Sequence, residues 1–213
     1  GQGQYLYHWL RLGLRLDFKQ KLTLVGQIDV PRGFVVGDST QHVEAARDSF
    51  AAPRWYDIYP RTLYLEYASP IGVFRLGQQA SHWAMGIVAN DGDHPSLFGD
   101  YRRGSLSERL LFATTPFGKG SPLFIALAGD VIFQDPTADL LNNHDRAFQG
   151  VLAIAYRTRT TELAFYSVLR HQERDQKATA DFTGFKEGLT AGVLDWSGRF
   201  NAPIPATRAF AYG

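Results

Sequence analysis

The chain of 213 residues lacks cysteine altogether, has few lysines and contains no long apolar run. The absence of cysteine excludes disulfide bonds, thiolate metal ligands and cysteine nucleophiles. No stretch approaches the ~20 apolar residues of a membrane-spanning helix. The formal net charge is only +1, so no strong overall field would attract nucleic acid, and we expect no nucleic-acid partner.

The sequence is instead rich in aromatic residues and in arginine. Aromatic residues make up 14% of the chain, which argues against disorder. Of the 22 basic residues, five are lysine and the remaining 17 are arginine. Arginine is favoured where a planar, permanently charged group pairs with carboxylates or phosphates in a partly desolvated place. A purely solvated surface would use lysine more often.

Helical periodicity is scarce, and a period of two recurs instead. In the stretch YLYHWLRLGLRLDF, every second residue from Leu10 to Phe18 is apolar, whereas Arg11 and Arg15 stand between them. Such alternation predicts strands with one apolar and one polar face. The predicted strands span residues 4–17, 21–31, 61–68, 72–80, 104–115, 122–133, 148–157, 161–171 and 185–199, and a tenth begins near Ala206.

The connections between these strands alternate in length. Short ones, such as Phe18–Gln20 and Ser69–Gly72, alternate with long ones, such as Arg32–Pro60 and Ser81–Arg103. If neighbouring strands pair antiparallel, all short turns lie at one end of the sheet and all long loops at the other. This asymmetry is typical of outer-membrane barrels, whereas compact soluble domains usually have connections of about 2–6 residues.

The polar face of the predicted strands supports a wet interior. It is built from arginine, tyrosine, tryptophan, glutamine and aspartate, whereas a solvent-facing side would favour lysine, glutamate and serine. Its arginines can pair with five carboxylates, at Asp17, Asp29, Glu66, Asp130 and Glu162. The strands 122–133 and 148–157 differ, because alanine and valine occupy their inward positions. Small inward residues are common where a loop or plug folds against the wall, but a doubly buried soluble strand has the same pattern.

The sequence thus predicts an all-β fold, an antiparallel up-and-down transmembrane β-barrel with nine or ten strands. Residues 1–213 would form a single barrel domain. The chain ends in RAFAYG rather than in a terminal aromatic strand, and it carries no charged-then-apolar leader. We therefore expect the sequence to be part of a larger barrel, without its signal peptide and its last strands. The alternative is a soluble β-rich domain.

The segment GVFRLGQQASHWAMGIVANDGD, Gly72–Asp93, resembles a family of predicted outer-membrane barrel proteins from myxobacteria and relatives. Their pattern is L-x-x-G-R-x-x-S-x-W-G-x-G-I-x-x-N-x-G-D. More distantly the chain is similar to phosphate-selective and alginate-export porins, which carry R-x-G-R/Q-Q. Gln78 departs from the family pattern, which often has arginine, and Ala84 stands where glycine is common. The matching residues are Arg75, Gly77, Gln78, Gln79, Ser81, His82, Trp83, Gly86, Ile87, Asn90, Gly92 and Asp93. The resemblance implies an outer-membrane barrel of the porin type and brings no known substrate.

The candidate site is a set of polar side chains that the strand pattern turns toward the interior. Rings of basic side chains select anions in pores. The alternative is that the arginines form salt bridges in the wall and give little selectivity, because acidic residues nearly balance them. The predicted pore-lining residues are Arg11, Arg15, Lys21, Glu66, Arg75, Gln79, Arg109, Asp130, Arg157 and Arg170.

Other chemistry has little support in the sequence. Asn90, Asp91 and Asp93 form a weak candidate Ca²⁺ site, but the segment lacks the bidentate glutamate of an EF-hand and reads first as turn chemistry. No nucleophile elbow, phosphate-binding loop or paired-histidine motif occurs. We therefore expect no cofactor, no catalytic residues and no enzyme activity.

These observations lead to one functional expectation and two alternatives. We expect a porin-like channel of the bacterial outer membrane that passes small polar or anionic solutes by passive diffusion through an arginine-lined lumen. Its partners would be outer-membrane lipid and the solutes, and self-association is left open. The alternatives are a plugged barrel whose long loops bind a partner or a polysaccharide, and a soluble β-rich binding domain.

Overall fold

The structure is a computed structural model, and it contains strands and connections but no helix in the part of the chain that it describes. None of these segments is a helix long and apolar enough to cross a membrane. The described residues are 5–8, 10–30, 34–37, 58–84, 86, 89–92, 104–135, 137–138, 140, 144–176, 185–203 and 210–212.

Twelve strands occur in these residues, and most agree with the predicted ranges within two or three residues. The two longest, β10 and β11, run well beyond their predicted ends. The strands are β1 (Tyr5–His8), β2 (Arg11–Phe18), β3 (Leu22–Asp29), β4 (Phe34–Gly37), β5 (Tyr59–Ser69), β6 (Gly72–Ala80), β7 (Leu106–Thr114), β8 (Leu123–Gln134), β9 (Arg146–Arg157), β10 (Thr161–Gln176), β11 (Phe185–Pro203) and β12 (Phe210–Tyr212).

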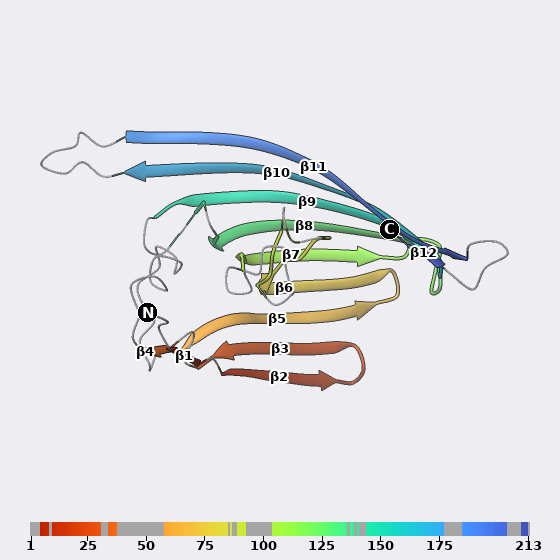
Figure 1. Ribbon diagram of the computed structural model, residues 1–213, viewed down its shortest axis with the longest axis horizontal. Helices are drawn as coiled ribbons and strands as arrows, with labels where there is room; N and C mark the ends of the chain where they lie inside the picture. The colour runs from red at the N-terminus through yellow and green to blue at the C-terminus, as the bar shows by residue number, and fades with distance from the viewer. Residues whose placement is uncertain are drawn as a thin grey trace, which may run out of the picture.

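Ten of the strands form one curved antiparallel sheet (Figure 1). Their order is β12-β11-β10-β9-β8-β7-β6-β5-β3-β2, so each strand pairs with its neighbours in the chain apart from the step across β4. The predicted all-β, up-and-down antiparallel fold is therefore confirmed. The sheet is open, with β2 at one edge and β12 at the other. The remaining strands, β1 and β4, form a separate two-stranded sheet.

The ends of the sheet differ as the connection lengths predict. The turns that join β2 to β3, β5 to β6, β7 to β8 and β9 to β10 all lie at the same end of the sheet (Figure 1). The strand ends joined by the longer connections lie at the opposite end. Up-and-down pairing therefore gathers the long connections at one rim.

The predicted first strand, residues 4–17, is wrong as a single element. It divides into β1, which pairs with β4, and β2, which pairs with β3. The β2–β3 ladder ends at Arg11 opposite Asp29, and the backbone N–H of Val30 still bonds to Leu10. Pro31 follows in the sequence and has no N–H with which to extend the ladder. Strand β4 falls within a segment predicted as loop.

A β-bulge in β5 places a charged residue inside. Gln27 pairs with Thr62 and Ile28 pairs with Pro60, so Arg61 is the extra residue of the bulge. A bulge redirects the side chain of the extra residue. The Arg61 side chain is only 1% exposed, and its guanidinium donates to the backbone carbonyl of Asp91. The bulge therefore joins the edge of β5 to the connection that follows β6.

The two faces of the sheet have opposite character. We call the face that carries Thr23, Arg109 and Tyr166 the inner face, because Trp83 from the connection after β6 packs on it. The opposite, outer face carries apolar side chains that are exposed along the whole sheet, including Leu14 on β2, Leu127 on β8 and more than a dozen others. The buried polar residues lie mainly on the inner face and in its connections. This distribution reverses that of a soluble sheet, in which polar groups face water.

Gly77 on β6 occupies a backbone conformation that other residues rarely adopt. Its φ is +127°, and a Cβ atom there would collide with the carbonyl oxygen of Leu63 on the neighbouring strand. Gly13 on β2 offers a contrast on the same face, because a Cβ added there meets nothing within 4 Å. Glycine at 77 is therefore a requirement of close strand packing.

We predict that Gly77→Ala lowers the free energy of unfolding by about 1–3 kcal/mol, the typical cost of a strained backbone conformation. The measurement is urea unfolding followed by tryptophan fluorescence. Gly13→Ala is the matched control and should change stability far less. Equal effects of the two substitutions would contradict the packing argument.

Candidate functional site

The six arginines of the predicted lumen lie on strands whose register turns them to the inner face. Arg109 on β7 stands opposite Asp130 on β8, Asp130 stands opposite Gln149 on β9, and Gln149 stands opposite Arg170 on β10. On the other half of the sheet, Arg75 stands opposite Glu66. Paired residues in an antiparallel sheet project from the same face. The structure therefore brings the arginines together with the carboxylates on one surface.

On β2 and β3 the arginines pair with nearby aspartates. Arg11 binds Asp29 through two hydrogen bonds, from Nε to Oδ1 at 2.6 Å and from Nη2 to Oδ2 at 3.1 Å. Arg15 Nε lies 3.1 Å from Asp17 Oδ2, and the Thr23 hydroxyl donates to the other oxygen of Asp17 at 2.6 Å. The Arg11 pair is half-buried and bidentate, whereas the Arg15 pair is exposed.

Arg75 of β6 is held from β5. Its Nε donates to Glu66 Oε2 at 2.6 Å, and its guanidinium carbon lies 5.3 Å from the ring centroid of Tyr64. A guanidinium over an aromatic ring gains a cation–π interaction. The Arg75 side chain nevertheless remains 40% exposed, so it both stiffens the wall and presents charge to the inner side.

The pair of Arg109 and Asp130 is the most deeply buried of these contacts. Nε and Nη2 of Arg109 each lie 2.6 Å from a different oxygen of Asp130. Gln149 Nε2 donates to Asp130 Oδ2 at 2.7 Å. The side chains of Arg109 and Asp130 are 8% and 0% exposed. Burial of a pair is tolerated when such bidentate geometry and additional hydrogen bonds compensate desolvation.

At the turn end of the sheet, two arginines share one carboxylate. Arg157 Nη2 lies 2.6 Å from Glu162 Oε1, and Arg199 Nη2 lies 3.1 Å from Glu162 Oε2. Both guanidinium groups are largely exposed, whereas Glu162 is 23% exposed. This cluster carries one positive charge more than its single carboxylate neutralises.

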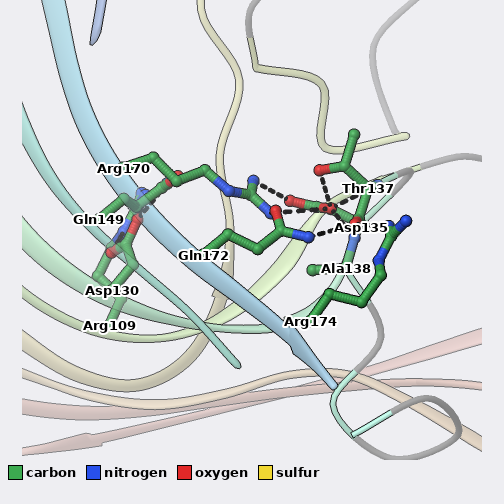
Figure 2. A network of polar contacts seen from close by, with 9 residues as sticks. All are labelled: Arg109, Asp130, Asp135, Thr137, Ala138, Gln149, Arg170, Gln172 and Arg174. Atoms are coloured by element: carbon green, nitrogen blue, oxygen red, sulfur yellow. Dashed lines mark hydrogen bonds and ion pairs between the residues drawn. The ribbon is translucent and has the colours of Figure 1, made fainter. Parts of the chain in front are cut away.

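At the loop end, Arg170 fixes the connection between β8 and β9. Its Nη1 lies 2.5 Å from Asp135 Oδ2, and its Nη2 donates to Gln172 Oε1 at 2.9 Å. Asp135 Oδ1 accepts the backbone N–H groups of Thr137 and Ala138, both at 2.8 Å. Figure 2 shows this carboxylate between the β10 side chains and the turn.

Two further contacts secure the same connection. Gln172 Nε2 and Arg174 Nη2 both donate to the carbonyl of Thr137, at 2.7 and 3.1 Å (Figure 2). Ala138 packs against Ile132 and Ala147 in a small buried cluster. The start of the β8–β9 connection is therefore folded toward the inner face.

The charges of the arginine ladder balance. Each of the five carboxylates predicted to pair does so, and Arg170 takes Asp135, which the sequence places in a loop. Six arginines thus meet six carboxylates. This is the arrangement expected of salt bridges in the wall, and it leaves little net field from the ladder itself.

Of the two remaining basic or amide residues of the predicted set, Gln79 is buried in the sheet, whereas Lys21 lies in a turn. The Gln79 side chain is 4% exposed, and its amide donates to the backbone carbonyls of Arg109 and Gly77 at 3.2 and 3.3 Å. It therefore satisfies backbone groups inside the wall. Lys21 lies in the exposed turn between β2 and β3 rather than within a strand.

The weak Ca²⁺ candidate forms a turn. Asn90 Oδ1 accepts the N–H of Gly92 at 2.7 Å, and the Asp91 carbonyl accepts from Arg61. Asp91 Oδ1 lies 3.7 Å from His82 Nδ1. Asp93 lies outside the described residues. No group of three or more metal-ligating side chains occurs in the described part of the chain.

Trp83 is an inner-face residue that the strand pattern did not find. Its ring stacks on Tyr166 of β10 with centroids 4.7 Å apart, and its Nε1 donates to Asp195 Oδ2 of β11 at 2.9 Å. It also packs near Val151 and Ala153. A loop therefore folds against the small inward residues, one of the two readings their pattern allowed. Its sequence position carries no signal of this long-range contact.

The inner face also holds a cavity of about 750 Å³, beside Trp83 and over strands β7 to β10. Arg75 and Arg109 line one part of it, and Arg157 with Glu162 lines another. Its volume lies within the range of small-molecule sites.

No model of a known protein family matches the chain, and no curated protein matches its sequence. The resemblance to outer-membrane barrels therefore rests on sequence patterns, at Gly72–Asp93 and also at Asp100–Arg103 and Leu194–Phe200, and the fold is an open antiparallel sheet compatible with a barrel.

We predict that Asp130→Ala lowers the free energy of unfolding by about 3–5 kcal/mol, because it leaves Arg109 buried without its carboxylate. Replacing both partners, by Arg109→Met with Asp130→Leu, should restore most of the loss. Urea unfolding measures each variant. Arg15→Ala, at an exposed pair, is the control and should leave the midpoint nearly unchanged, because Asp17 keeps its hydrogen bond from Thr23. A double variant as unstable as Asp130→Ala would show that the ion pair itself is required.

Proposed function

We propose that this protein is a porin-like channel of the bacterial outer membrane, in which the outer face contacts lipid and the inner face lines a wet lumen. Small polar solutes and anions would pass by passive diffusion. The observation that carries this proposal is the inversion of the sheet. Its exposed large apolar side chains lie mainly on one face, and most of its arginine–carboxylate pairs and buried polar groups lie on the other face or in the connections.

The size of the apolar surface supports lipid contact. Soluble monomers rarely expose contiguous apolar patches larger than a few hundred Å². Here exposed leucines and aromatic residues run from Leu14 on β2, through Leu65 and Leu127, to Trp196 on β11. Alternation of lipid-facing and lumen-facing residues is the pattern of transmembrane barrels.

The balanced ladder supports weak ion selectivity. A ring of unpaired guanidinium groups would select anions strongly, but each ladder arginine lies against a carboxylate. The surplus charge at Arg157 and Arg199 is offset elsewhere on the inner face by Asp195 of β11, so it favours anions only locally, at the turn end. We therefore infer a channel for small polar solutes with a slight anion preference.

A second candidate function is a plugged barrel whose long connections bind a partner or a polysaccharide. Two observations favour it: Trp83 packs across the inner face, and the β8–β9 connection is tied down by Arg170. Conductance separates the candidates. Stepwise currents of the reconstituted protein in planar bilayers support the channel, and their absence supports the plug.

We predict that Leu127→Arg destabilises the protein in lipid bilayers by about 2–4 kcal/mol, the cost of arginine on the lipid face near the midplane. Leu127 is 51% exposed in the middle of β8, so in a soluble domain the same change would be nearly neutral. The measurement is reversible urea unfolding from lipid vesicles.

Phe117→Arg is the matched control, because Phe117 is 80% exposed in the turn between β7 and β8. It should change stability by less than about 0.5 kcal/mol. If Leu127→Arg were equally harmless, the outer face would not contact lipid. The same gel mobility in SDS before and after boiling would count against the barrel as well.

We further predict that substitutions at the Arg75–Glu66 pair move ion selectivity in opposite directions. Arg75→Gln leaves an uncompensated carboxylate and should shift the reversal potential in a salt gradient toward cation preference. Glu66→Gln should shift it toward anion preference. The double variant should lie close to the unmodified protein, because the wall is again neutral there. An unchanged reversal potential in both single variants would place this pair outside the conducting path.

A further inference from the structure

The inner face divides into an ionic half and an apolar half. On β7 to β10, three successive rows of paired residues are almost entirely apolar. One row runs from Leu111 through Ala128 to Val151, the next through Ala126 and Ala153, and the third through Ala155. In a wet lumen such a surface is unfavourable unless something apolar covers it.

We call these three rows the apolar floor, and charged residues border it at both ends. The buried pair of Arg109 and Asp130 bounds it toward the long connections, and Arg157 with Glu162 bounds it toward the turns. Small side chains leave space above the floor, and this space is the cavity of about 750 Å³. Trp83, stacked on Tyr166, forms an aromatic wall beside it.

The two charged boundaries are not equivalent. Arg109 and Asp130 neutralise each other through two hydrogen bonds and are shielded from solvent. Arg157 and Arg199 share Glu162 and remain 69% and 76% exposed. An anionic group entering the cavity would therefore be attracted to the turn end. A guanidinium that is partly exposed can still donate further hydrogen bonds in its plane.

We propose that this cavity is a binding site for an amphipathic organic monoanion. The apolar part of the ligand would lie on the apolar floor beside Trp83, and its anionic group would lie at Arg157 and Arg199. The site rests on the proposed function, in which the inner face is wet and accessible to solutes. Tyr166 and Glu162 are four residues apart on β10, a separation of about 13 Å along a strand. A phenyl ring joined to a carboxylate by a short chain fits this length.

The test uses the protein in lipid nanodiscs and three probes: 4-phenylbutyrate, its uncharged amide 4-phenylbutyramide, and butyrate. Isothermal titration is corrected with empty nanodiscs, so that partition into lipid is subtracted. We expect saturable binding of 4-phenylbutyrate and at least tenfold weaker binding of the other two. If butyrate binds as tightly as 4-phenylbutyrate, the role of the apolar floor is overturned. If the amide binds as tightly as 4-phenylbutyrate, the role of the arginines is overturned.

Variants locate the site. Ala155→Leu fills part of the cavity above the apolar floor and should lower the affinity for 4-phenylbutyrate at least tenfold. Ala191→Leu, on the inner face of β11 opposite Arg170, should leave that affinity unchanged. Arg157→Gln should reduce the affinity for 4-phenylbutyrate to that of the amide and leave the amide unchanged. Arg15→Gln is its matched control on the ionic half. Loss of amide binding in Arg157→Gln would indicate a merely structural role for Arg157.

Conductance and the Leu127→Arg measurement keep the two proposals apart. If the protein conducts and Leu127→Arg is destabilising in lipid, but 4-phenylbutyrate shows no saturable binding, the site is wrong and the channel stands. If no current is seen but binding saturates and responds to Ala155→Leu, the site stands in a closed barrel. Binding that is unchanged in Ala155→Leu and in Arg157→Gln would place the ligand elsewhere and overturn the assignment.

Discussion

Side chains along a β-strand alternate between two faces, so a slip of one residue in pairing would turn a whole strand inside out. In this sheet the ion pairs oppose such a slip. Arg109 lies directly opposite Asp130, and Arg75 directly opposite Glu66. A shift by one would separate each pair and would place their charges among the leucines of the outer face. Both the apolar face and the polar face therefore depend on the same register, which these ion pairs make specific.

That register also divides the inner face into two chemical halves. On β2, β3, β5 and β6 the inward positions include ion-paired side chains such as Arg11 with Asp29 and Arg75 with Glu66. On β8 and β9 the corresponding positions are mostly alanine or valine, which leave a hollow that Trp83 borders. Long polar side chains are ordered by their salt bridges, whereas small ones lose little conformational entropy and create room. The inner face thus carries ion pairs on one side and a hollow on the other.

Local alternation explains why much of this structure could be predicted from sequence. Strand positions and the pairing of Arg11 with Asp29 follow from a period of two and from the order of the chain. Three features could not follow from it. The break before β2 depends on where its partner β3 ends, the burial of Arg61 depends on a bulge, and the position of Trp83 depends on a contact 112 residues away at Asp195. Each of them is fixed by tertiary structure and leaves no periodic signal.

An apolar outer face and open sheet edges impose a joint requirement. Strands β2 and β12 end the sheet, and an edge strand presents backbone N–H and C=O groups without ladder partners on one side. Water could satisfy those groups but would make the exposed leucines unfavourable. Lipid would accept the leucines but cannot satisfy the backbone. If the outer face contacts lipid, as proposed, both edges must therefore be paired there, with each other or with further strands. Closure is thus a physical condition of the lipid-facing arrangement, because the same strands supply both the apolar face and the unpaired edges.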